Sequence, residues 1–173
     1  MATDNSNDKV AEDALRDQQT LLQTMIDAVP VPIYFKDPDG VYLSCNKAFA
    51  KFTGLPIDEV VGKTVYDVTS AAFADKNDSS DKDLLKKGGT IVFEAAVKAP
   101  DGSLRDIVFH KAVHTRSDGT TTGIAGSMLD VTDRKETQKL LRHMANHDSL
   151  TGVPNRNLGK DRLITALARA KRN

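Results

Sequence analysis

The chain has 173 residues, enough for one domain of ordinary size with flanking segments. Its 24 basic and 24 acidic residues balance, so no net charge favours a nucleic acid or a membrane surface as a partner. A single cysteine excludes an intrachain disulfide framework and a cysteine-rich zinc site, and we expect no metal site. The polar opening and the absence of an apolar run of about 20 residues argue against a signal peptide and a membrane span, and predict a cytoplasmic protein.

The first 29 residues are predicted to form a short disordered lead and one helix. Residues 1–10 are too polar to pack, which predicts the disordered lead. From Ala11 onward, apolar residues recur at helical spacing, which predicts a helix over 11–29. Pro30 and Pro32 then end it.

Residues 30–131 alternate strand signals with short helical segments. A hairpin is predicted where Asp37-Pro38-Asp39-Gly40 separates two β-prone runs. Asn46 is a plausible N-cap for a short helix that ends at Gly54, and a longer helix is predicted over about 70–87. Three segments rich in β-formers follow, separated by turn residues: 90–99, 104–115 and 121–131.

This element order predicts an α+β domain at residues 30–131. Five antiparallel strands with the helices on one face would bury a single core. A further helix is predicted over 132–147, with a weak apolar seam that suits a two-stranded coiled coil.

Two blocks resemble the halves of a PAS domain. The first runs Lys36-Asp37-Pro38-Asp39-Gly40-Val41-Tyr42-Leu43-Ser44-Cys45-Asn46-Lys47-Ala48-Phe49. The second combines Gly123-Ile124-Ala125-Gly126 with the exit motif Asp130-Val131-Thr132-Asp133-Arg134-Lys135. The resemblance implies the PAS fold, a five-stranded antiparallel sheet, and a sensory role.

A third block is similar to the opening of GGDEF diguanylate cyclase domains. It reads His147-Asp148-Ser149-Leu150-Thr151-Gly152-Val153-Pro154-Asn155-Arg156. The resemblance implies that residues 148–173 are the start of such a domain. It also implies a guanine contact for Asn155 and an ion pair of Asp148 with Arg156, while a helix N-cap is the simpler role for Asn155.

Together, the resemblances imply a sensory module that controls cyclic-di-GMP synthesis by a C-terminal GGDEF domain, with GTP as the substrate of the full-length protein. The signature loop and metal-binding aspartate of that family are absent from residues 148–173, so we expect this chain alone to be non-catalytic. The alternative is a ligand-free PAS dimerisation module whose GGDEF domain is degenerate and whose output is a cyclic-di-GMP phosphodiesterase.

The common PAS cofactors are not expected. Haem-binding relatives carry a histidine on the helix before the third strand, and residues 69–89 contain none. Flavin-binding light sensors carry a reactive cysteine in a different segment, so Cys45 is better explained as a small buried apolar residue. A small organic ligand remains as the alternative.

Five residues in apolar strands are candidates for such a ligand site: Tyr34, Lys36, Tyr42, His110 and Lys111. Because side chains alternate along a strand, only one of His110 and Lys111 can face the core, and flanking residues do not decide which. A lysine in a pocket would suit a carboxylate ligand, but a lysine at the sheet surface is the simpler interpretation. Asp81 and Asp83 are most simply helix-starting or solvent-facing acids.

The two flanking helices predict a homodimer. Leu15, Leu22, Met25 and Ile26 on the first helix form an apolar set that a compact core need not cover. On the last helix, Leu140, Leu141 and Met144 form a second such apolar set. We expect a parallel dimer with Leu22 and Leu140 near the seam.

Overall fold

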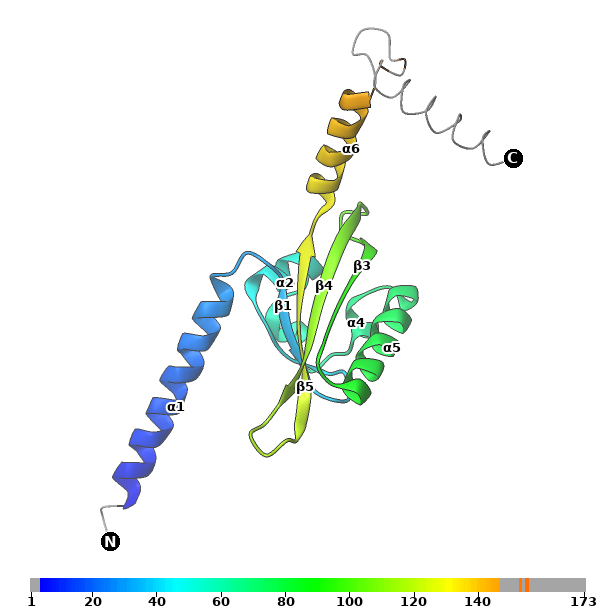
Figure 1. Ribbon diagram of the computed structural model, residues 1–173. Coiled ribbons are helices and arrows are strands. Elements are labelled where there is room, and N and C mark those ends of the chain that lie inside the picture. Colours follow the sequence, from blue (N-terminus) through cyan, green and yellow to red (C-terminus); the bar gives the residue numbers. More distant parts are fainter. Residues whose placement is uncertain (1–3, 147–152, 154, 156–173) are drawn as a thin grey trace. The chain divides into compact units, whose positions relative to one another are not determined.

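The computed structural model describes residues 4–146, 153 and 155 (Figure 1). The chain divides into two units between Asp130 and Val131. The first holds the sheet and most helices, and the second begins with α6. Among the described residues, no helix is both long enough and apolar enough to cross a membrane.

Helix α1 spans Asp4–Asp27 and therefore starts earlier than the sequence predicts. Residues 4–10 were expected to be a disordered lead, which is wrong. The segment contains no glycine or proline, and acidic side chains near a helix N-terminus stabilise the helix dipole. A polar segment can therefore be helical when it continues directly into a segment with a clear helical pattern.

The sheet has five antiparallel strands in the order β2-β1-β5-β4-β3, which confirms the predicted PAS-type α+β fold (Figure 1). The strands are β1 (Ile33–Lys36), β2 (Tyr42–Cys45), β3 (Thr90–Lys98), β4 (Leu104–Thr115) and β5 (Thr121–Asp130). The first strand therefore lies between β2 and the last strand. This order places β1 and β4 on either side of β5.

Four helices connect β2 to β3. They are α2 (Lys47–Thr53), α3 (Ile57–Val60), α4 (Val65–Val68) and α5 (Ala71–Lys87). The longest, α5, runs alongside β3 and β4 (Figure 1). Their apolar side chains share one core with the inner face of the sheet, formed by Tyr34, Tyr42, Cys45, Phe49, Val60, Val97, Ile107, Phe109 and Met128.

Asn46 joins three elements at one end of the domain. Its side chain is fully buried; the Oδ1 atom accepts hydrogen bonds from the amides of Ile33 and Phe49. The Nδ2 group donates to backbone carbonyls at the end of α1, including that of Ile26. The predicted N-cap of α2 is therefore confirmed, and the same side chain also fixes the end of α1 against β1.

In the second unit, α6 spans Thr132–Asn146 and buries none of its residues. Leu140, Leu141 and Met144 are each about three-fifths exposed. Asn155 donates hydrogen bonds to the carbonyls of Ala145 and Asn146 at the end of this helix. The predicted roles of Asp148 and Arg156 lie outside the described residues.

Candidate functional site

The register of the sheet aligns three residues across β1, β5 and β4. Tyr34 pairs with Gly126, and Gly126 pairs with Lys111. A Cβ atom on Gly126 would lie 2.2 Å from the Tyr34 ring, so the absence of a side chain lets the ring lie across β5. The tyrosine therefore extends from β1 over β5 in the direction of Lys111.

Lys36 and Lys111 meet beneath α5 although 75 residues separate them in the chain. Each is 1% exposed. Both bind the Asp81 carboxylate, with Nζ–O distances of 2.8 Å for Lys36 and 2.5 Å for Lys111. Each also donates to Asn77 Oδ1 at 3.2 Å. We call these four residues the lysine cluster.

Two simple interpretations of the sequence are wrong here. Lys36 and Lys111 do not reach the sheet surface, and Asp81 does not face solvent; only Asp83 does. Burial of any one of these charges alone would be unfavourable, so each depends on its partners. Asn77 and Asp81 are four residues apart and therefore share one face of α5.

The choice between His110 and Lys111 is also decided. Lys111 faces α5, whereas His110 is exposed on the opposite face. Tyr34, Lys36 and Tyr42 are all buried on the α5 side. The structure thus brings four of the five candidate ligand residues together and leaves His110 outside the site.

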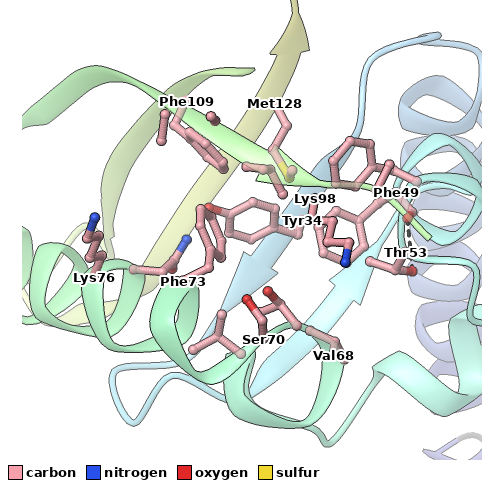
Figure 2. Close-up of a pocket in the computed structure, with 18 of the residues that line it drawn as sticks. Tyr34, Phe49, Thr53, Val68, Ser70, Phe73, Lys76, Lys98, Phe109 and Met128 are labelled. Atoms are coloured by element: carbon pink, nitrogen blue, oxygen red, sulfur yellow. Dashed lines mark hydrogen bonds between the residues drawn. The ribbon is translucent and has the colours of Figure 1, made fainter. Parts of the chain in front are cut away.

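A cavity of about 910 Å³ lies between α5, α2 and the inner face of the sheet (Figure 2). Its walls are mainly aromatic and aliphatic; Tyr34 lies in the midst of them, with Phe73 beside it and Phe49 and Met128 among its other neighbours (Figure 2). A concave, mostly apolar cavity with few polar groups is typical of small-molecule sites.

Two residues that line this cavity, Tyr34 and Ser80, carry a buried hydroxyl group. Tyr34 is 2% exposed, and its hydroxyl has no hydrogen-bond partner among the described residues. The hydroxyl of Ser80, on α5, is likewise buried without a partner in that part of the chain. Both residues line the cavity. A buried polar group without a partner is unfavourable unless a further molecule satisfies it.

The two lysines of the lysine cluster lie behind the aromatic wall, whereas its Asn77 lines the cavity. Lys36 Nζ is 5.4 Å from the centre of the Tyr34 ring and 4.8 Å from that of Tyr42. Lys111 Nζ is 5.2 Å from the centre of the Phe93 ring. All three rings line the cavity, so the two ammonium groups are separated from it by one layer of aromatic side chains.

Burial governs ionisation in this region. Burial, and then the charge on Asp81, raise the pKa of Tyr34 well above its ordinary value, so its hydroxyl keeps its proton. Burial also raises the pKa of Cys45. Burial lowers the pKa of Lys111, the Asp81 carboxylate opposes that change, and the charge of Lys36 adds to it.

The lowered pKa of Lys111 predicts a pH-dependent stability. Between the folded-state pKa and the ordinary value of 10.5, the unfolded chain binds more protons at this residue than the folded chain. The contribution of Lys111 to stability therefore becomes more favourable as pH rises toward 10.5. The free energy of unfolding can be measured by urea unfolding at several pH values from about 7 to about 9.5. Its slope against pH should be more positive for wild type than for Lys111→Met. Equal slopes would contradict the lowered pKa.

Comparison with known proteins identifies relatives in bacterial signalling. The family model described as "PAS fold" matches residues 26–136. The virulence sensor protein BvgS of Bordetella pertussis is 29% identical over 171 residues, covering 92% of this chain and 13% of that protein. The cyclic di-GMP phosphodiesterase PdeR of Escherichia coli is 28% identical over 142 residues, covering 82% of this chain and 22% of that protein.

A solved structure agrees with the observed fold. The PAS domain of Bordetella pertussis BvgS is 28% identical and superposes with a TM-score of 0.61, covering 73% of this chain and 95% of that one. The chain spans about one eighth of the length of the BvgS proteins it matches. The likeness therefore concerns the domain and does not extend to the activity of those whole proteins.

Proposed function

Because this chain belongs to the PAS family, a family of sensory domains found in signalling proteins, we propose that it senses a small organic molecule in the cavity beneath α5. The observation that carries the proposal is an aromatic-walled cavity of about 910 Å³ lined by Tyr34, whose buried hydroxyl has no partner among the described residues. A bound molecule would satisfy that hydroxyl and fill apolar space. No haem or flavin is part of the proposal.

Two residues on β3 allow a matched test. Ala95 lines the cavity and is half-buried against the core, whereas Val92 is exposed and does not line the cavity. Ala95→Phe should fill the cavity and weaken binding of benzoate or benzamide at least about tenfold, whereas Val92→Phe should not. Isothermal titration calorimetry measures both. Equal binding by the two variants would place the ligand elsewhere.

The output is proposed to be cyclic-di-GMP synthesis by a GGDEF domain that begins at residues 148–173. The motif at residues 147–156 supports this assignment. The E. coli relative, named as a cyclic-di-GMP phosphodiesterase, supports the same signalling pathway with the alternative output. Assaying the protein that carries this chain for product formation from GTP and for cyclic-di-GMP hydrolysis distinguishes the two outputs.

The proposed signalling unit is a parallel homodimer through the flanking helices. On α1, Leu15, Leu22 and Met25 are all more than half exposed and recur at heptad spacing. Burying a leucine contributes about 1.5–3 kcal/mol, while association costs an estimated 4–15 kcal/mol, so several such residues per protomer are needed. The exposed apolar residues of α1 and α6 together provide that number.

Leu22→Asp should therefore weaken self-association about tenfold or more in sedimentation equilibrium. Leu43→Asp is the control, because Leu43 is exposed on the edge strand β2. A wild type that stays monomeric at tens of micromolar would contradict the dimer. A dimer weakened only by Leu43→Asp would place the contact at the sheet edge.

A further inference from the structure

We propose that the cavity takes a compact aromatic carboxylate, whose anionic group accepts a hydrogen bond from the Tyr34 hydroxyl. The inference rests on the proposed function, because it names the ligand class for the same cavity.

The lysine cluster carries an excess of cationic groups. Two lysines, Lys36 and Lys111, share a single carboxylate, that of Asp81. Asn77 contributes only a neutral amide oxygen to each ammonium group. When both lysines are protonated, the buried cluster has one uncompensated positive charge, which attracts an anion through low-dielectric surroundings more strongly than through water.

Tyr34 lies between Lys36 of the lysine cluster and the cavity. Its ring lies over Gly126, in the same row of the sheet as Lys111, and Lys36 Nζ is 5.4 Å from the ring centre. Tyr34 lines the cavity, and its buried hydroxyl has no hydrogen-bond partner within the described part of the chain. A protonated hydroxyl is a donor suited to an anionic acceptor, and hydrogen bonds to charged groups are the stronger ones.

The walls suit a planar ring. Phe93 and Phe109 stack with their ring centres 5.0 Å apart, and Phe73 lies 5.6 Å from Phe109. Exposed charged residues also line the cavity, namely Lys76 and Lys98 with Glu94. With two cations and one anion, this rim has a net positive charge, as the lysine cluster does, and both favour an anionic ligand. Aromatic faces and a positive rim together favour an aromatic anion.

Benzoate and benzamide, which have nearly the same shape and differ in charge, test the inference by isothermal titration calorimetry. Wild type should bind benzoate about tenfold or more tightly than benzamide. Tyr34→Phe should remove most of that preference. Lys111→Met, which leaves one ammonium group opposite one carboxylate, should weaken benzoate and leave benzamide unchanged.

Tyr66→Phe is the matched control, because Tyr66 is half exposed and does not line the cavity. It should keep the wild-type preference, and a urea unfolding midpoint near that of wild type would show that Tyr34→Phe is folded. Equal binding of the two probes, or a preference that survives Tyr34→Phe, would overturn the charge inference and leave the proposed function standing. If neither probe binds to wild type, both are overturned.

Discussion

Asp81→Ala is expected to lower the free energy of unfolding by about 3–5 kcal/mol, because it leaves two buried ammonium groups without a carboxylate. Asp81 is 4% exposed, so water cannot replace the lost oxygens without opening the contact of α5 with the sheet. A loss of this size is a large part of the 5–15 kcal/mol that stabilises a typical domain. Urea unfolding followed by circular dichroism measures it.

Asp83→Ala is the control on the same helix, since Asp83 is exposed and should change stability by less than about 0.5 kcal/mol. A triple variant, Lys36→Met with Asp81→Leu and Lys111→Met, should recover most of the loss, because apolar residues of similar volume often replace buried ion pairs without cost. An Asp81→Ala protein as stable as Asp83→Ala would show that the lysines are not held by this carboxylate.

Gly123→Ala is expected to destabilise the domain by a similar amount, for a steric reason. Gly123 has a φ of 146°, and a Cβ atom there would lie 1.8 Å from the Lys36 carbonyl oxygen. The obstacle is backbone on β1, so no side-chain rotation relieves it. A strained backbone conformation costs about 1–3 kcal/mol, and overpacking costs about 1–3 kcal/mol or more. Thermal and urea unfolding should both show a loss of about 2–6 kcal/mol, the sum of these costs.

Gly119→Ala separates the two causes. Gly119 has a φ of 86° and nothing within 4 Å of a Cβ atom, so alanine there meets only the backbone cost. Its loss should be about 1–3 kcal/mol. If Gly123→Ala were no worse than Gly119→Ala, the close approach of β5 to β1 would be disproved.

Local sequence signals predicted most of the fold. The turn at residues 37–40 is held as expected: Asp37 Oδ1 accepts from the amides of Asp39 and Val41, and Gly40 has a φ of 84°. The strand over 104–115 and the helix over about 70–87 agree closely with β4 and α5. These elements depend on residues near in sequence, which a single chain displays directly.

The lysine cluster could not be predicted in the same way. Its contacts join residues 30 to 45 positions apart, and they depend on the strand register and on the rotation of α5. Alternation along β4 allowed either His110 or Lys111 to face inward. The choice follows from the continuous inward face of Ile107, Phe109 and Lys111, which only pairing with β3 and β5 makes visible.

Methyl NMR during a benzoate titration shows directly whether the cavity beneath α5 binds a small molecule. Met128 and Ala95 line the cavity, and Val92 is exposed on β3 as a control. We expect saturable shifts of the Met128 and Ala95 methyl signals with Val92 unchanged. Saturable shifts at Val92 alone, or no saturable shift at Met128 and Ala95, would contradict binding in the cavity.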